Sequence, residues 1–286
     1  MKVYDCFPFF NELDILEVRL QELWDTVDYF VLAESNISHS GNPKEYIFEN
    51  NKDRFSKYMS KIRHIKVNDV PETSDSWVRE KYQRWALERG LNDMQPEDIV
   101  ITSDCDEIAR AEIIKMIKED ENNWDRYILY IPMFQFRLNY MKIHDFTKGA
   151  NIMVTRGRVY TNAQQEREYT FYWNQKPKDT VFLEHGGWHF TYLGDDKHAL
   201  TKIVNFAHTE TNIPRFTKDK LTIDFMIENK CGLLGPAELY KEKFEWVVVD
   251  DYFPDCIVND LEKWKPFIIP NAELKVTDLY KEDNIC

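Results

Sequence analysis

The sequence has no apolar run of about 18 residues, the length that a helix needs to cross a membrane. We also expect no cleavable leader in its first residues, because Asp5, Asn11 and Glu12 interrupt the apolar positions. Internal repeats, low-complexity tracts and linker-like stretches are also missing. We therefore expect a single domain without a membrane span, located in the cytoplasm.

Cysteine is scarce and irregularly placed. The five cysteines are an odd number and none has C-x-x-C spacing; they are Cys6, Cys105, Cys231, Cys256 and Cys286. This pattern argues against a disulfide framework and against a zinc site, and it fits a reducing compartment.

Positive charge is also in short supply. Lys and Arg number 37 against 50 Asp and Glu, which gives a formal net charge of −13. Nucleic acids and anionic membranes need basic surfaces, so we expect neither as a partner. A single nucleotide held by a local basic pocket and a metal ion remains compatible with this charge.

Apolar residues, by contrast, are plentiful and are arranged in alternating strand and helix patterns. Hydrophobic residues make up 43% of the 286 positions, which is ample for a large core. The pattern predicts strands at 2–7, 29–33, 62–67, 99–102, 127–136, 152–155 and 180–183, with a last short strand at 247–249. It predicts helices from Asn11 as N-cap, near 50–59, and at 76–87, 109–119, 197–207 and 217–229.

This alternation indicates βαβ crossovers and therefore an α/β fold of Rossmann type. We expect a mostly parallel central sheet with helices on both faces. Within the single domain 1–286 we expect a nucleotide-binding half at 1–107, an acceptor-side half at 108–240 and a C-terminal segment at 241–286 that wraps the sheet.

The most informative stretch is a buried, β-branched strand that ends in carboxylates, Ile99 to Glu107. In open α/β sheets ligands bind beyond the carboxyl ends of the strands, where Asp104 and Asp106 would present two hard oxygen donors. Such donors suit Mg²⁺ or Mn²⁺, and a bound ion would neutralise the charge of a departing diphosphate. The alternative is that Asp104 caps a following helix, and the motif by itself leaves both interpretations open.

Polar residues near the same predicted edge are candidates for nucleotide binding. Glu34 and its loop, which carries His39, follow an early strand where an acid can accept hydrogen bonds from ribose, although a solvated loop acid fits equally well. Arg79, Gln83 and Arg84 recur on one helix face and can reach phosphate or the Asp104 carboxylate. Ion pairing with Glu80 and Glu88 on the helix surface is the alternative for them.

A glycine-flanked aromatic segment, 184–194, supplies two further candidates. His189 can be a third metal ligand, or a hydrogen-bonded core histidine. Trp188 can form the apolar floor on which a sugar ring rests.

Taken together, several of these motifs resemble glycosyltransferase family 17. They are Tyr4-Asp5-Cys6-Phe7-Pro8-Phe9-Phe10-Asn11-Glu12-Leu13-Asp14, the strand 28–34 with His39-Ser40-Gly41, Arg79-Glu80 with Gln83-Arg84, Ser103-Asp104-Cys105-Asp106-Glu107, and Gly187-Trp188-His189-Phe190. The resemblance covers roughly residues 1–210 in the same order. It implies a GT-A-like fold, a UDP-sugar donor, a divalent metal and inversion at the anomeric carbon. It also implies that Asp104 and Asp106 form the metal and diphosphate site, with His189 as a ligand.

The predicted function is therefore metal-dependent, inverting transfer of a sugar, GlcNAc in the first instance, from a UDP-sugar to a glycan hydroxyl. The candidates for the general base are Glu184 first, then Asp224 and Glu210. A non-catalytic sugar-nucleotide or glycan-binding protein is the alternative. A metal-dependent phosphoesterase is a weaker one, because it needs more ligands than Asp104, Asp106 and His189. The sequence does not determine the oligomeric state.

Overall fold

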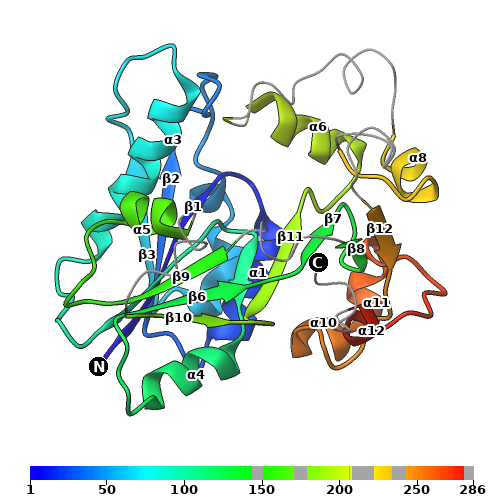
Figure 1. The fold of residues 1–286 in the computed structure, drawn as a ribbon. Helices are drawn as coiled ribbons and strands as arrows, with labels where there is room; N and C mark the ends of the chain where they lie inside the picture. Colours follow the sequence, from blue (N-terminus) through cyan, green and yellow to red (C-terminus); the bar gives the residue numbers. More distant parts are fainter. Residues whose placement is uncertain (144–150, 171–178, 206, 208–221, 234–242, 280–286) are drawn as a thin grey trace. The chain divides into compact units, whose positions relative to one another are not determined.

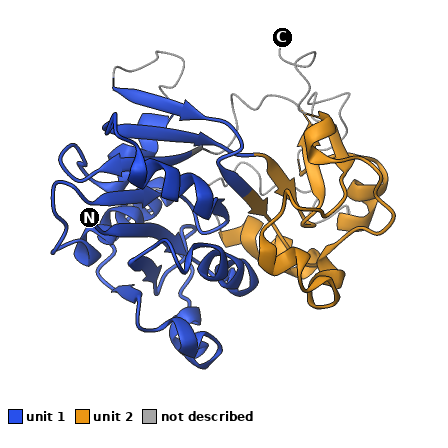
Figure 2. Cartoon of the chain, turned by 90° about the horizontal axis from the view of Figure 1, so that it is seen from below, with its two compact units in different colours: residues 1–131, 150–188 blue, residues 132–149, 189–286 orange. Residues whose placement is uncertain are grey.

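The computed structural model describes residues 1–143, 151–170, 179–205, 207, 222–233 and 243–279 (Figure 1). The chain divides into two compact units, coloured separately in Figure 2. Unit 1 comprises residues 1–131 and 150–188, and unit 2 comprises residues 132–149 and 189–286. The single-domain organisation with segments 1–107, 108–240 and 241–286 stays a prediction.

Unit 1 is built on a seven-stranded sheet. Its spatial order is β10 (Thr180–Leu183), β6 (Arg126–Tyr130), β9 (Asn151–Arg156), β4 (Ile99–Thr102), β1 (Val3–Phe9), β2 (Tyr29–Ser35) and β3 (Ile62–Val67). Every neighbouring pair is parallel except those that include β9, which runs antiparallel to β4 and β6. The predicted mostly parallel sheet is therefore confirmed, and the carboxyl ends of β1, β2 and β4 lie at one edge.

Helices cover both faces of this sheet because successive strand residues point to opposite sides. On β1, Phe7 packs into the core cluster that contains α1 and α4 side chains, whereas Cys6 packs into the cluster that contains η2 and α5 side chains. The helices of unit 1 are α1 (Leu13–Leu23), α2 (Ile47–Asn50), α3 (Ser76–Trp85), α4 (Ala111–Glu119) and α5 (Ala163–Tyr169), with 3-10 turns η1 (Lys52–Tyr58) and η2 (Ala86–Gly90). The predicted α/β class is confirmed.

Unit 2 contains shorter elements. Strands β12 (Lys243–Trp246), β8 (Tyr140–Ile143) and β7 (Met133–Gln135) form a sheet with the later part of β11 (Gly187–Thr191). Its helices are α6 (Asp196–Asn205), α8 (Ile223–Glu228), α10 (Asp255–Val258), α11 (Leu261–Trp264) and α12 (Val276–Leu279), with the turn η6 (Lys265–Phe267). No helix in the described ranges has the length and apolarity required to span a membrane.

The long aromatic strand predicted at 127–136 is wrong. The structure forms β6 up to Tyr130, which belongs to unit 1, and a separate strand β7 from Met133, which belongs to unit 2. Pro132 lies between them, and proline has no N–H to donate to a strand ladder. The apolar run is therefore divided between two units.

The predicted helix directly after the acidic motif is also wrong at its start. Residues Glu107–Ala109 form a short strand, β5, and α4 begins only at Ala111 with Arg110 as its N-cap. Asp104 is consequently not a helix cap. It lies too far ahead of the first turn to accept a hydrogen bond from its amides.

Smaller differences concern the ends of other elements. The N-cap of α1 is Glu12 rather than Asn11, and the Glu12 carboxylate accepts hydrogen bonds from the amides of Phe10 and Asn11. In place of a strand at 247–249, β12 ends at Trp246 and Val247 makes a single bridge to Leu274. Helix α8 begins after Thr222, and residues 217–221 of the predicted helix lie outside the described part of the chain.

Candidate functional site

The candidate site of unit 1 is the acidic segment Ser103–Glu107, which follows β4 at the carboxyl edge of the sheet. All four residues of β4 are buried, so the strand is fixed in the core and fixes the position at which the acidic segment begins. The Asp104 amide donates a hydrogen bond to Glu107 Oε2 at 2.9 Å, which folds the segment back on itself. The Asp104 side chain is 29% exposed, so it is accessible in part from solvent.

Two arginines from different helices hold the Asp104 carboxylate. Arg84 Nη2 of α3 lies 2.8 Å from Oδ1, and Arg167 Nη2 of α5 lies 3.2 Å from Oδ2. Arg84 also pairs with Glu80 one turn earlier, at 2.9 Å. Both interpretations of Arg84 from the sequence are thus partly correct, because it contacts Asp104 and forms a pair within its own helix.

The electrostatics keep Asp104 ionised. Burial raises the pKa of its carboxyl, but the positive charges of Arg84 and Arg167 outweigh this effect and hold the pKa well below the usual range. Asp106, which is buried two residues further on, acts in the opposite direction by repulsion. The segment therefore carries a charged oxygen donor at neutral pH.

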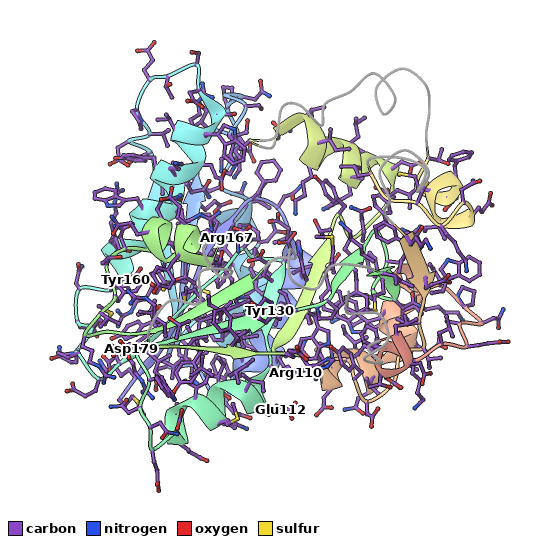
Figure 3. The ribbon with its side chains drawn as sticks, in the orientation of Figure 1. Arg110, Glu112, Tyr130, Tyr160, Arg167 and Asp179 are labelled. Atoms are coloured by element: carbon purple, nitrogen blue, oxygen red, sulfur yellow. The ribbon has the colours of Figure 1, made fainter. Side chains whose placement is uncertain are left out.

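Arg167 also fixes Glu107. Its Nη1 lies 2.7 Å from Glu107 Oε2 and its Nη2 lies 2.8 Å from Oε1, which is a two-point contact with a nearly inaccessible carboxylate. Figure 3 labels Arg167 beside α5. No pattern in the sequence pointed to Arg167, because it is 60 or more residues from both acids and its helix is short.

The buried guanidinium of Arg84 has further hydrogen-bonding capacity. Its Nε and Nη1 atoms are inaccessible and meet no acceptor among the described residues. Buried donors without an acceptor are uncommon in folded proteins and mark places where a ligand or water can supply one.

Gln83 and Arg79, on the same helix, act as ties between backbone segments. Gln83 Nε2 donates to the carbonyls of Phe9 and Ala33, at the ends of β1 and β2, and its Oε1 lies 2.9 Å from His39 Nε2. Arg79 Nη1 donates to the His39 carbonyl at 2.7 Å. These contacts anchor the loop after β2 to α3. The direct role in nucleotide binding predicted for Arg79, Gln83 and His39 stays a prediction.

Glu34 is not the solvated loop acid that the sequence left open. It lies within β2 and is fully buried, with His64 Nε2 at 3.0 Å, Lys44 Nζ at 3.4 Å and the Phe48 amide at 3.1 Å from its carboxylate. The predicted contact with ribose stays a prediction.

Glu88 was the alternative ion-pair partner for the arginines of α3. In the structure its carboxylate accepts hydrogen bonds from Tyr160 Oη and the Ala163 amide instead.

The segment 184–188 lies beside β5 in unit 1. The Arg110 amide donates to the Gly186 carbonyl and Arg110 Nε donates to the His185 carbonyl, each at 2.9 Å. Gly187 packs directly on the Ile108 carbonyl, where a Cβ would overlap the oxygen. Figure 3 labels Arg110 at the start of α4. One short strand thus links the acidic segment to the segment that carries Glu184.

Glu184 is exposed and close to two other titratable groups. Burial lowers the pKa of His185, an effect that the negative charge of Glu184 opposes. Burial raises the pKa of Tyr130, and Glu184 adds to the rise. Trp188 is 1% exposed and the Arg110 guanidinium lies 4.1 Å from the centre of its ring. A sugar platform at Trp188 stays a prediction.

The remaining candidates lie outside unit 1. His189 is on β11 opposite Met133, and Asp224 is in the first turn of α8 with its side chain 82% exposed; both belong to unit 2. Glu210 lies outside the described residues. In the described ranges no three His, Cys, Asp or Glu side chains come together as a metal cage. The ligand role of His189 and the base roles stay predictions.

Arg19 also contacts the segment and was missed. It forms a buried ion pair with Asp5 and donates to backbone carbonyls of the acidic segment. The signal was present in the sequence, because Arg19 follows Leu16 and precedes Leu20 and Leu23 within the apolar stripe of α1. An arginine on the buried face of a helix needs a partner in the core.

Sequence comparison with known proteins finds glycosyltransferases. The sequence model of glycosyltransferase family 17 matches residues 1–229. Two similar proteins are β-1,4-mannosyl-glycoprotein 4-β-N-acetylglucosaminyltransferases, from Rattus norvegicus (29% identity over 125 residues) and Homo sapiens (30% over 125 residues). The match covers 41% of this chain and 23% and 24% of the two relatives, so it spans about a quarter of their length.

Solved structures give looser similarities. A putative glucose-1-phosphate thymidylyltransferase from Bacillus anthracis has a TM-score of 0.37 at 11% identity, covering 66% of this chain and 88% of that one. S. aureus TarS has a TM-score of 0.40 at 11% identity, covering 76% of this chain and 71% of that one. At these scores the similarities support no argument about function.

Proposed function

The chain belongs to glycosyltransferase family 17, and from this premise we propose that it transfers N-acetylglucosamine from a UDP-sugar to a glycan hydroxyl with the help of a divalent metal. The names of the two mammalian relatives support the sugar. The UDP-sugar donor is what the resemblance to the family implies, and the carboxylates that follow β4 support a divalent metal.

The proposal rests on the charge and position of the Asp104 side chain. Its carboxylate is partly exposed, is kept ionised by Arg84 and Arg167, and follows a central strand at the edge where ligands of α/β sheets bind. Two guanidiniums from separate helices thus hold a charged carboxylate at the edge where a ligand would bind.

The residues present fit Mn²⁺ or Mg²⁺. A carboxylate has about four lone-pair sites, and the two arginines use one on each oxygen of Asp104. Mg²⁺ is commonly held by one or two carboxylates, with phosphate oxygens and waters completing its shell. Asp104, with Asp106, would therefore hold the ion, which when bound would neutralise the charge of the diphosphate leaving group. A third ligand from His189 is a prediction from the sequence alone.

The diphosphate would be bound by the same cluster. Arg84 places a positive charge next to Asp104, which would attract the diphosphate. Arg167, which is held by Glu107, adds a second positive charge next to Asp104.

The transfer itself would be a single displacement with inversion. The acceptor oxygen attacks the anomeric carbon, the bond from that carbon to the diphosphate oxygen breaks, and UDP departs with the electron pair. A carboxylate takes the hydroxyl proton. Glu184 is the first candidate because it is exposed and its segment is hydrogen-bonded to the end of β5.

The test is a thermal-shift panel of nucleotide sugars with and without Mn²⁺, followed by a transfer and donor-hydrolysis assay. Ligands that bind the folded state raise the melting temperature, and we expect UDP-GlcNAc with Mn²⁺ to do so. Asp104→Asn should abolish the shift. The matched control is Asp93→Asn, since Asp93 is also paired with an arginine, Arg63 at 2.6 Å, and with Lys2, which precedes β1 at the opposite edge.

Two results would contradict the proposal. One is a wild-type protein whose melting temperature no nucleotide sugar raises in the presence of Mn²⁺. The other is binding without transfer to any acceptor and without slow donor hydrolysis, which would favour the non-catalytic alternative.

A further inference from the structure

Arg19 is a fully buried charged group next to the candidate site. It lies in α1 and pairs with Asp5 of β1, with Nε 2.7 Å from Oδ2 and Nη2 2.5 Å from Oδ1. Both side chains have no exposed surface. The two charges therefore compensate each other within the core, and the Phe7 ring, whose centre lies 4.2 Å from the Arg19 guanidinium carbon, adds a cation–π contact.

The remaining donors of Arg19 all go to the acidic segment. Nη1 donates to the carbonyls of Asp104 at 2.8 Å, Cys105 at 3.2 Å and Glu107 at 2.8 Å. Nη2 donates to Ser103 Oγ at 2.7 Å, and this hydroxyl in turn donates to the Glu107 carbonyl at 3.0 Å. Three carbonyls within four residues thus converge on a single nitrogen.

Such convergence sets the direction of the side chains. A carbonyl that points at Arg19 fixes the orientation of its peptide plane, and the planes on either side of a residue determine where its Cβ points. Asp104 supplies one of these carbonyls, and Asp106 lies between Cys105 and Glu107, which supply the other two. Contacts on the buried side of the segment therefore constrain the backbone next to each aspartate, and with it the direction of its Cβ.

Stability alone is a weak explanation for this ion pair. Buried ion pairs can often be replaced by apolar side chains of similar volume without loss of stability, whereas removal of one partner is costly. Lysine cannot replace Arg19 either, because an ammonium group is a point charge without the planar fork that reaches a carboxylate and several carbonyls together. The pattern of contacts fits a residue that shapes the segment.

We propose that Arg19, held by Asp5, is a positioning residue that orients Asp104 and Asp106 for the metal and diphosphate; this inference rests on the proposed function. Arg19 does not touch the ligand. It acts through the backbone of residues 103–107, and partners of this kind typically change metal affinity or activity by 10- to 100-fold when they are mutated.

The main test is the double variant Asp5→Leu with Arg19→Met, which removes both charges and keeps the core apolar. We expect a folded protein with a lower melting temperature, because the carbonyls of the acidic segment lose the Arg19 donor, and a Kd for Mn²⁺ with UDP that is about 10- to 100-fold higher. The matched control is Arg156→Met, since Arg156 is another buried arginine that donates to a carbonyl, that of Ile117, away from the acidic segment. The control should lose stability without a comparable change in Kd.

Wild-type affinity in the folded double variant would overturn the proposal. If the double variant does not fold, Arg19→Lys takes its place, with the same expected rise in Kd in a folded protein and the same overturning result. A merely structural role would lower the melting temperature without this change in affinity.

Hydrogen exchange separates failure of this inference from failure of the proposed function. Amides of residues 103–107 should exchange at least tenfold faster in the double variant, while those of β2 and β3 should be unchanged. If the wild type binds no Mn²⁺ and UDP, the proposed function fails by itself. Unchanged exchange at 103–107 then overturns the positioning role, and faster exchange supports the orienting effect of Arg19 on the segment.

Discussion

Arg84 Nη2 lies 2.8 Å from Asp104 Oδ1, and this contact joins helix α3 to the end of strand β4. The two residues are 20 positions apart; Arg84 lies on the buried face of α3, and Asp104 follows a strand whose four residues are all buried. Together with Arg167 the pair defines the charge state of the candidate site, and this charge state can be tested.

Asp104 should contribute to the acid sensitivity of the protein. Its pKa in the folded state is lowered, with burial opposed by Arg84 and Arg167, whereas an unfolded Asp has a pKa of about 3.9. Ionised Asp104 therefore adds stability above about pH 4, and this contribution is lost as the pH falls further, through the folded pKa. Urea unfolding of the wild type and Asp104→Asn should show a difference in free energy that shrinks below about pH 4.

The exposed acid Asp224 serves as the control for this measurement. Asp224→Asn should differ little from the wild type at any pH. A constant difference between the wild type and Asp104→Asn from pH 7 to pH 3 would contradict the assignment of Asp104 as an ion-paired carboxylate.

Arg167→Lys should destabilise unit 1. The variant keeps the charge but loses the two-point contact with Glu107, which is nearly inaccessible, and the contact with Asp104. Hydrogen bonds to charged groups contribute about 1.5–3 kcal/mol each, so we expect a loss of about 2 kcal/mol in urea unfolding.

The control is Arg158→Lys, because Arg158 pairs with Asp125 in a more exposed position. A surface pair contributes about 0–1 kcal/mol, so this variant should be near the wild type. Equal effects of the two substitutions would argue against a special role for the Arg167 contacts.

Gly187→Ala should disturb the link between β5 and the segment 184–188. A Cβ at residue 187 would overlap the Ile108 carbonyl oxygen, which is backbone and cannot rotate away. Overpacking typically costs about 1–3 kcal/mol. Thermal unfolding measures the loss, and a melting temperature equal to that of the wild type would show that the close approach is not required.

Glu184→Gln should slow transfer without changing donor binding. Removal of a general base lowers the rate by about 10²- to 10⁴-fold, while the affinity for the nucleotide sugar depends on other groups. The comparison is with Asp224→Asn and Glu210→Gln under saturating donor. Full activity of Glu184→Gln, with a loss in one of the other two variants, would reassign the base.

The strands and the central position of the acidic motif could be predicted because they follow from local pattern. The β-branched run 99–102 has few alternatives to a buried strand, and a parallel sheet places its end beside those of β1 and β2. The division of the apolar run 127–136 at Pro132 was harder to predict. Periodicity alone does not show that two parts of one run pack in different units.

Spacing predicted some partners of the site residues, since Arg84 contacts both Asp104 and Glu80 as expected, but it did not predict the others. Helical periodicity correctly placed Arg79 and Gln83 on one face, but it did not show that their donors tie the ends of β1 and β2 and the loop at His39. Arg19 carried a signal, as a charge in an apolar stripe, without an indication of which acid it meets.

The order of apolar and polar residues along the chain was enough to specify a mostly parallel sheet with helices on both faces and two aspartates beyond one of its inner strands. Periods of 2 and 3.6 residues in the burial of side chains are a local property, and they can be read from the sequence. Only the folded chain determined that Arg167 and Arg19 join Arg84 at the acidic segment. The reason is that these residues come from elements whose separation in sequence says nothing about their distance in space.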